Sequence, residues 1–118
     1  MDRTYVEHPP LPRSVAERQL SSGDAAVIAS TLIGLSLHEP DWEWVQRHAE
    51  AFARHPSADV RRSVAMVLGN LAMIHGQLDV TSAAPILLRL AADPEVAVEA
   101  ADAIEEVEIG TGLSVSAG

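Results

Sequence analysis

The chain has 118 residues and a mass of 12.6 kDa, which is the size of one small domain and leaves no room for a second independent core. Apolar residues make up 47% of the sequence and aromatic residues only 3%. The core must therefore consist of small and aliphatic side chains, which favours packed helices over sheets. The formal charge is −9, with 17 acidic residues against 8 basic ones, and this argues against non-specific binding to nucleic acid or to an anionic membrane.

The sequence contains no cysteine, which excludes disulfides, a thiol nucleophile and any cysteine-based metal site. The first residues lack the apolar stretch of a signal peptide. The longest apolar stretches, 27–37 and 83–92, are interrupted by polar residues or arginine and are too short to span a bilayer. We therefore expect a cytoplasmic protein.

Proline and serine mark the start of the folded part of the chain. Residues 1–13 end in a proline-rich stretch and are predicted to be an extended lead-in. Ser14 and Glu17 match a capping box, which would satisfy free amides at the start of the first helix. We predict one helical domain over 14–110, followed by a flexible tail over 111–118.

Within the domain, helix-breaking residues separate a series of apolar-periodic segments. Pro85 is expected in the first turn of its helix, where proline is tolerated, and Gly110 is expected to end the last helix. The six predicted helices span 15–21, 24–37, 42–54, 59–75, 83–92 and 95–109.

The six helices form three pairs, and the second helix of each pair repeats the same apolar pattern. A shift of 36 residues aligns four apolar positions at helical spacing, namely Ile28, Val64 and Ala100; Ala29, Ala65 and Ala101; Leu32, Leu68 and Ile104; and Leu35, Leu71 and Val107. A repeat of this length indicates stacked helical hairpins. The sequence therefore predicts an all-α fold, an α-α superhelix of three antiparallel hairpins.

Two stretches carry a more specific pattern. Residues 55–65 read His-Pro-Ser-Ala-Asp-Val-Arg-Arg-Ser-Val-Ala, and Leu-Gly-Asn-Leu follows at 68–71. This stretch resembles the second half of a HEAT repeat, and Asp-Pro-Glu-Val at 93–96 is similar to the same element, with Ala97 where the repeat has arginine. The resemblance covers roughly residues 24–109 and implies a HEAT-like solenoid. Most HEAT proteins are protein-binding scaffolds.

A further resemblance joins several short motifs. It rests on Asp-Trp-Glu-Trp-Val-Gln at 41–46, His-Pro at 55–56, Leu-Gly-Asn-Leu-Ala at 68–72, Ile-His-Gly-Gln-Leu-Asp at 74–79 and Asp-Pro-Glu-Val at 93–96. Together these are similar to compact bacterial HEAT-like proteins, some of which are immunity proteins of polymorphic or contact-dependent toxin systems. That resemblance implies tight, stoichiometric inhibition of one protein partner.

Catalytic motifs are absent from the sequence: it has no Gly-x-Ser-x-Gly elbow, no phosphate-binding glycine-rich loop and no His-Glu-x-x-His helix. Of the five histidines, all except His48 fall at predicted breaks or helix ends. The pair His38–Glu39 resembles the His-Glu pairs of HEAT-type di-iron hydroxylases, but those enzymes need several such pairs. We therefore expect no enzymatic activity, no metal and no cofactor.

Negative charge concentrates at the end of the chain. From Asp93 onward there are seven acidic residues and no basic one, whereas the preceding 92 residues carry ten acidic and eight basic residues. Glu105, Glu106 and Glu108 lie toward the C-terminal end of the last helix, where each negative charge costs about 0.3–1 kcal/mol. Two explanations remain open: the helix binds a cationic partner, or it is a polar outer face that keeps the last repeat soluble.

The 36-residue register also indicates which side chains share a surface. It places Ser30, Met66 and Asp102 at equivalent positions, and likewise Gly34, Asn70 and Glu106, and Val27, Ser63 and Glu99. In HEAT arrays the second helices line the concave side, so these positions would form one surface. We predict that the partner-binding residues are Glu99, Asp102, Glu105, Glu106, Asn70 and Met66.

The sequence also supports expectations for Arg61, for Trp44 and for the helix over 25–37. In HEAT-like repeats the arginine after the valine often bridges neighbouring units, which implies a structural role for Arg61. Trp44 is either an exposed binding residue or packs against the first repeat. The apolar helix over 25–37 is covered either by the helix over 15–21 or by a partner.

The function favoured by these observations is non-enzymatic protein binding. In the first hypothesis the chain is an immunity protein that neutralises a cationic, nuclease-like toxin through its acidic face, acting as a monomer without binding nucleic acid or membrane. The alternative is a general HEAT-repeat scaffold or adaptor domain in a multi-protein complex.

Overall fold

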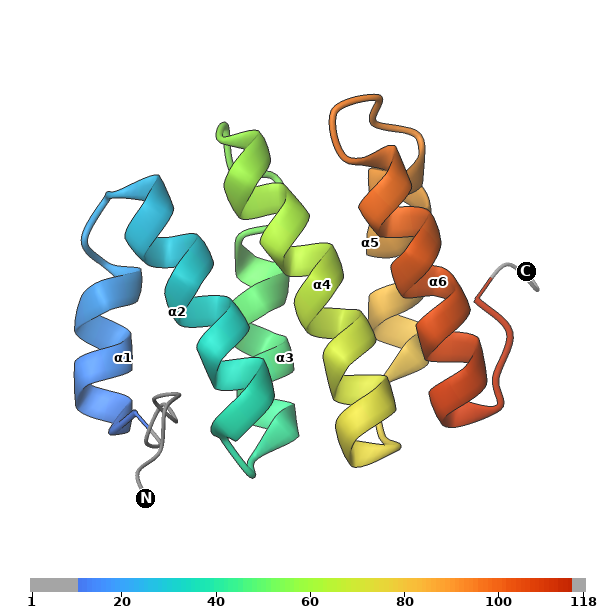
Figure 1. Ribbon diagram of the computed structural model, residues 1–118, viewed down its shortest axis with the longest axis horizontal. Coiled ribbons are helices and arrows are strands. Elements are labelled where there is room, and N and C mark those ends of the chain that lie inside the picture. The colour runs from blue at the N-terminus through green and yellow to red at the C-terminus, as the bar shows by residue number, and fades with distance from the viewer. Residues whose placement is uncertain (1–10, 116–118) are drawn as a thin grey trace, which may run out of the picture.

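The computed structural model describes residues 11–115, and this part of the chain contains six α-helices and no strand. They are α1 (Arg13–Leu20), α2 (Ala25–His38), α3 (Trp42–Ala51), α4 (Ala58–His75), α5 (Val80–Ala91) and α6 (Ala97–Thr111). In Figure 1, α2, α4 and α6 lie side by side as one layer, with α3 and α5 behind them and α1 beside α2. The predicted all-α architecture of packed helical hairpins is confirmed. No helix among residues 11–115 is long and apolar enough to cross a membrane.

The central element is α4, which packs against α2 on one side and α6 on the other. Nine of its residues are buried. The aligned apolar positions form the core, and the buried members are Ile28, Val64 and Ala100; Leu32 and Leu68; Leu35, Leu71 and Val107; and Ala65. Two residues of α6 depart from the pattern, because Ala101 is exposed and Ile104 is half-buried. Among residues 11–115, no hairpin follows α6 to cover its outer side.

Three helices begin at an aspartate cap, and the start of one of them, α5, differs from the prediction. The carboxylates of Asp24, Asp41 and Asp79 accept hydrogen bonds from backbone N–H groups in the first turns of α2, α3 and α5. Because Asp79 is the cap, α5 begins at Val80, three residues earlier than predicted. Pro85 therefore lies in the second turn, so its placement in the first turn was wrong, and it removes one intrahelical hydrogen bond.

The predicted capping box at Ser14 and Glu17 is also wrong. The helix α1 begins directly after Pro12, at Arg13, and its N-terminus has no side-chain cap. The Pro12 φ of −59° already suits a helix start, and its carbonyl oxygen accepts the hydrogen bond from the Ala16 N–H. Ser14 is therefore inside the helix, where its hydroxyl cannot cap the first turn.

The last helix is shifted along the chain. Asp93–Val96 form a turn in which the Asp93 carboxylate accepts from the Glu95 N–H, so α6 begins at Ala97 and not at residue 95. It continues to Thr111 and ends at Gly112, whose φ is 74°. The prediction that Gly110 ends the helix was wrong.

Gly110 has a packing role in place of a capping role. A Cβ atom at this position would lie 2.6 Å from the carbonyl carbon of Ala72 on α4. Only a residue without a side chain allows α6 to approach α4 this closely. Glycine is thus required here for helix contact, although its positive-φ freedom is not used.

The segment after α6 also differs from the expected tail. Thr111 belongs to α6, and Val115 is buried, with its N–H donating to Glu108 Oε2 at 2.9 Å. The rest of the expected tail, residues 116–118, lies outside the described residues. So do residues 1–10 of the expected lead-in.

Arg61 joins the second and third hairpins. Its Nε donates to Asp93 at 3.0 Å and its Nη2 to Glu95 at 2.7 Å, while Nη1 donates to the carbonyl oxygens of His55 and Pro56. The side chain is 14% exposed, so the pair with Asp93 is largely removed from solvent. This is the bridging role that the HEAT resemblance implies for Arg61.

The first hairpin is joined to α3 by Arg13. Its guanidinium donates to Asp41 at 2.7 Å and lies 4.7 Å from the ring centroid of Trp44. The hydrogen bond from Arg13, followed by the one from the Trp44 N–H, lowers the pKa of Asp41. Trp44 is 7% exposed, and so it packs inside the protein beneath the first repeat.

Candidate partner-binding surface

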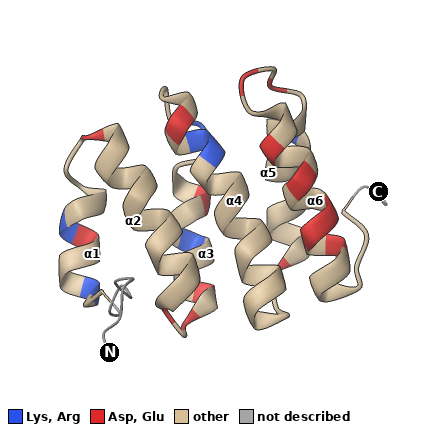
Figure 2. Ribbon diagram, in the orientation of Figure 1, with Lys and Arg blue, Asp and Glu red and all other residues tan. Residues whose placement is uncertain are grey.

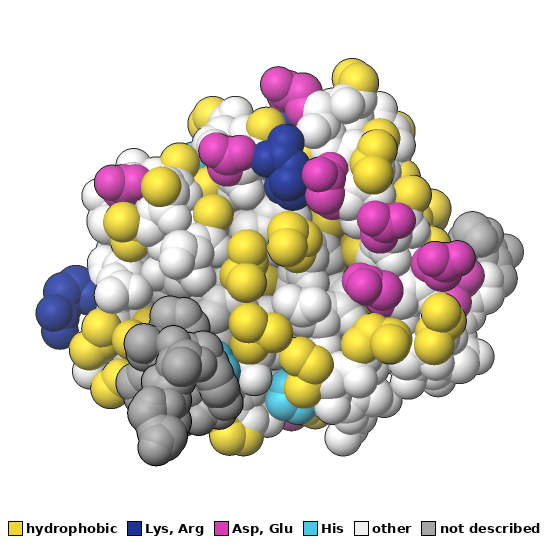
Figure 3. All heavy atoms as spheres, viewed as in Figure 1, with side chains coloured by type: hydrophobic (Ala, Val, Ile, Leu, Met, Phe, Trp, Pro, Cys, Tyr) yellow, Lys and Arg dark blue, Asp and Glu magenta, His cyan; other side chains and the backbone are white. Residues whose placement is uncertain are grey.

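The exposed sides of α2, α4 and α6 form one continuous face, which we call the α2/α4/α6 face. Figure 3 shows it directly, with carboxylates gathered over α6 and with apolar and small side chains over α2 and α4. Figure 2 shows the same asymmetry on the ribbon, because acidic residues follow one another along α6 while the helical part of α2 carries none. Negative charge on this face therefore increases from α2 to α6.

A hollow on this face lies between α4 and α6. It has a volume of about 210 Å³ and is lined by Met66, Asn70, Glu99, Asp102 and Glu106. We call it the acidic pocket. Five of the six residues predicted to bind a partner thus lie together. The sixth, Glu105, is exposed on α6 but does not line the pocket, because successive residues of a helix point about 100° apart.

The carboxylates of α6 are not equally available. Glu99 forms an ion pair with Arg62, with 3.3 Å between Oε2 and Nε, and Arg62 also pairs with Asp59 at 2.7 Å. In contrast, the structure records no ion pair for Asp102 or Glu106 within residues 11–115. Glu99 is therefore partly neutralised by Arg62, whereas no basic side chain among the described residues forms an ion pair with Asp102 or Glu106.

Glu105 and Glu108 also differ from each other. Within the described residues, Glu105 has no ion pair and stays exposed. Glu108 has a structural role, because it accepts a hydrogen bond from the Val115 N–H. The sequence analysis missed this role, since nothing in the local pattern indicates that the chain folds back after α6.

Two neighbours hold the acidic pocket in shape. Asn70 donates from its side-chain amide to Ser36 of α2 at 3.0 Å, which orients the amide beside the pocket. Gly69 leaves space for Glu106, because a Cβ atom on Gly69 would overlap Glu106 Oε1. The sequence analysis missed Gly69. The only indication of its role was a glycine inside a predicted helix, one residue before a site residue.

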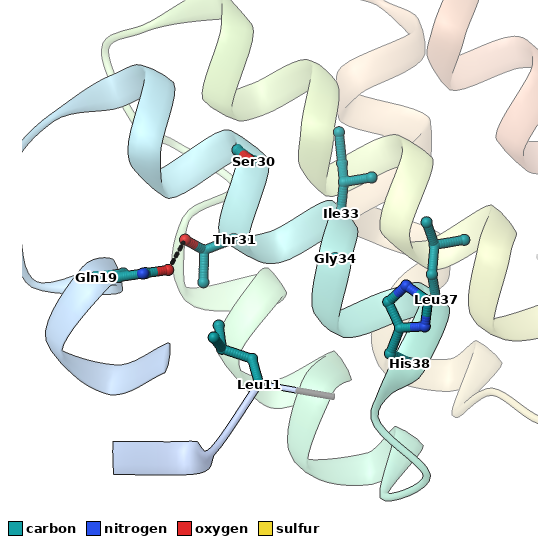
Figure 4. A pocket seen from close by; sticks show the side chains of 8 residues that line it. All are labelled: Leu11, Gln19, Ser30, Thr31, Ile33, Gly34, Leu37 and His38. Atoms are coloured by element: carbon teal, nitrogen blue, oxygen red, sulfur yellow. Dashed lines mark hydrogen bonds between the residues drawn. The ribbon is translucent and has the colours of Figure 1, made fainter. Parts of the chain in front are cut away.

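A second hollow was also missed by the sequence analysis. It is a groove of about 600 Å³ between α1 and α2, shown in Figure 4. Leu11, Ile33 and Leu37 provide its apolar walls, and Gly34 contributes only backbone. The groove shows that the helix over 25–38 is covered by α1 only in part, since Leu37 remains 46% exposed.

The described residues contain no group of three or more His, Asp or Glu side chains placed to hold a metal ion. The arrangement on the α2/α4/α6 face offers charged and apolar contact surfaces. Chemically, it can attract a cation at one end and accept an apolar side chain at the other.

Comparison with known proteins gives one informative likeness. No protein-family model matches the chain, and no curated protein matches it. Among solved structures, it is similar to a chain of the CDI complex from Cupriavidus taiwanensis LMG 19424, with a TM-score of 0.76 and 28% sequence identity. The match covers 93% of this chain and 99% of that chain. The likeness thus concerns the complete stack of hairpins and not a single repeat.

Proposed function

We propose that this chain is an immunity protein of a contact-dependent inhibition (CDI) system, which binds and neutralises a cognate toxin without catalysing a reaction. The observation that carries the proposal is the likeness to a chain of a CDI complex over almost the full length of both chains. We further propose that the three hairpins are HEAT-like repeats and that the protein acts in the cytoplasm as a monomer without a cofactor.

The acidic pocket supports a basic toxin as the partner. Asp102 and Glu106 line it without an ion pair among the described residues, and unpaired carboxylates at a surface attract a cationic protein and raise its association rate. A nuclease needs a cationic cleft to hold phosphate, and carboxylates on a rigid helix can occupy such a cleft in place of phosphates. Glu105 would add charge at the rim of this contact.

The centre of the proposed contact is less charged. Met66 is 39% exposed beside the acidic pocket, and methionine adapts its shape to a partner surface. Asn70 adds an amide that is already oriented by Ser36. Because the hydrogen bond to Ser36 orients the Asn70 amide before binding, less conformational entropy is lost at this residue when the toxin docks.

The test compares association kinetics of two double variants with the toxin domain encoded directly upstream of this chain's gene. Asp102→Asn with Glu106→Gln should lower the association rate at low salt by about tenfold and flatten its dependence on salt. Glu17→Gln with Glu43→Gln is the matched control, because it removes the same charge from exposed residues of α1 and α3, and its rate should stay close to that of the wild type.

Two results would contradict the proposal. The first is that wild-type protein neither binds this toxin domain nor protects cells that express it. The second is that both double variants change the association rate equally, since net charge and not the acidic pocket would then govern binding.

A further inference from the structure

The groove between α1 and α2 is suited to an apolar ligand. Its volume of about 600 Å³ lies within the range of ordinary ligand pockets, which is about 300–1,000 Å³. Leu11, Ile33 and Leu37 form its walls (Figure 4). None of the described residues that line it is an aspartate, glutamate, lysine or arginine, and His38 is the titratable side chain in the lining.

The Thr31 hydroxyl in the groove is already engaged. It lies 2.8 Å from Gln19 Oε1 and 2.7 Å from the carbonyl oxygen of Val27, so it donates within the protein. A ligand therefore does not need to supply a hydrogen bond to compensate for burial of this group. Apolar contact with the leucine and isoleucine side chains remains as the main favourable contribution to binding.

One position of the 36-residue register leaves room for the groove, because α2 has a glycine there. Gly34 of α2 is equivalent to Asn70 of α4 and to Glu106 of α6. Apart from the backbone of α2 itself, no atom of residues 11–115 lies within 4 Å of the place that a Cβ atom on Gly34 would occupy. The position that carries a polar side chain on α4 and a charged one on α6 is thus empty on α2.

The groove and the acidic pocket belong to the same face. The equivalent positions along it are Ser30, Met66 and Asp102; Gly34, Asn70 and Glu106; and Leu37, Met73 and Ile109. Leu37 is 46% exposed and Met73 is 51% exposed, so apolar surface continues from the groove toward α6. The molecule measures 47 by 31 Å along its two longest axes, and an ordinary interface buries about 800 Å² on each partner. One partner can therefore cover both hollows.

We propose that the toxin partner binds through a two-part contact, with an aliphatic or aromatic side chain in the groove and cationic side chains at the acidic pocket. This inference rests on the proposed function, because charge complementarity at the acidic pocket decides which class of protein lies on the face. The two parts act on different rates. The carboxylates speed association, whereas burial of the apolar side chain slows dissociation.

The test measures the dissociation rate of the upstream-encoded toxin domain from single variants. Leu37→Ala should raise this rate about tenfold, which corresponds to about 1.4 kcal/mol, with the association rate and its salt dependence unchanged. Gly34→Leu, which fills the groove, should raise it further. Leu88→Ala is the matched control, because Leu88 is similarly exposed, at 44%, but lies on α5 in the other layer. This variant should leave the association and dissociation rates unchanged.

Each outcome separates the two proposals. If the wild-type protein binds the toxin and neither Leu37→Ala nor Gly34→Leu alters dissociation, the groove proposal is overturned while the proposed function stands. If the wild-type protein does not bind the toxin, the proposed function fails. Thermal unfolding of both variants serves as the folding control, and neither variant is expected to unfold at a lower temperature than the wild type by more than a few degrees.

Two other occupants of the groove would also overturn the proposal. If deletion of residues 2–10 shifts the methyl NMR signals of Ile33 and Leu37 in the free protein, this chain's own N-terminal segment fills the groove. If the free wild-type protein sediments as a dimer and Gly34→Leu makes it a monomer, a second copy fills it. The proposal predicts neither result.

Discussion

The interface between α4 and α6 and the region between α1 and α2 are built in opposite ways. At the first, Gly110 lets two helices approach so closely that a Cβ atom would overlap the Ala72 backbone, and a Cβ atom on Gly69 would overlap the Glu106 carboxylate. At the second, apart from the backbone of α2 itself, no atom of the described residues lies within 4 Å of a Cβ atom added to Gly34. Glycine thus allows close helix contact in one region and leaves open space in the other. A glycine inside a helix therefore does not by itself indicate close packing, because the distance to the neighbouring helix must also be known.

The α2/α4/α6 face therefore has a closely packed part at α4 and α6 and an open part at the groove beside α1. Close packing at α4 and α6 fixes Glu106 over Gly69 and so positions the acidic pocket. No side chain of the described residues fills the groove beside α1, and the first hairpin is joined to α3 by the Arg13–Asp41 pair. Stability measurements on four single variants test this contrast.

The largest effect is expected at α4, which packs against both α6 and α2. Leu68 is fully buried at the centre of α4, so Leu68→Ala should lower the free energy of unfolding by about 2–5 kcal/mol. Chemical denaturation measures this change, with Leu88→Ala as the exposed control. A loss below that range would mean that the core is not centred on α4.

Gly110→Ala should come next. The new methyl group would lie 2.6 Å from the carbonyl carbon of Ala72, and backbone atoms cannot move aside as a flexible side chain can. Overpacking of this kind costs about 1–3 kcal/mol. Gly34→Ala provides the opposite result, because it adds a methyl group into open space and should raise stability by about 0.5–1 kcal/mol. If the two variants change stability in the same direction, the contrast between the two regions is wrong.

The smallest effect is expected at the pair that joins α1 to α3. The pKa of Asp41 is lowered in the folded protein, mainly by the hydrogen bond from Arg13, with Glu39 and Arg47 as the other charged groups nearby. The stability that this carboxylate contributes is therefore present above its usual pKa of about 4 and is lost as pH falls through the lowered value.

Asp41→Asn keeps a side-chain oxygen for the helix cap and removes the charge. Its melting temperature should be below that of the wild type at pH 7, and the difference should disappear on acidification below the lowered pKa. A difference that is the same at pH 7 and in strong acid would show that the ion pair contributes nothing.

The fold could be predicted from the sequence because its determinants are local or repeated. Proline and glycine breaks separated the helices, and the 36-residue register identified buried positions such as Leu35, Leu71 and Val107. The errors lie at helix ends. Asp79 caps α5, so this helix begins three residues before its predicted start, because propensity alone does not decide between neighbouring cap residues.

The acidic pocket was predictable for the same reason, since residues at one register position become neighbours when hairpins stack. Met66 and Asp102 were expected together, and they line one hollow. The groove and the role of Gly69 were not predictable. They depend on how close two helices approach, and this distance follows from packing across the whole interface and not from any segment alone.

The central claim is that a toxin binds on the α2/α4/α6 face. The chain has three methionines, and two of them, Met66 and Met73, are exposed on this face. NMR of methionine methyl groups labelled with ¹³C, recorded while the upstream-encoded toxin domain is added and assigned with Met66→Leu, observes the face directly. The account predicts that the signals of Met66 and Met73 shift or broaden in proportion to the amount of complex. Two unchanged signals in a fully formed complex would contradict it.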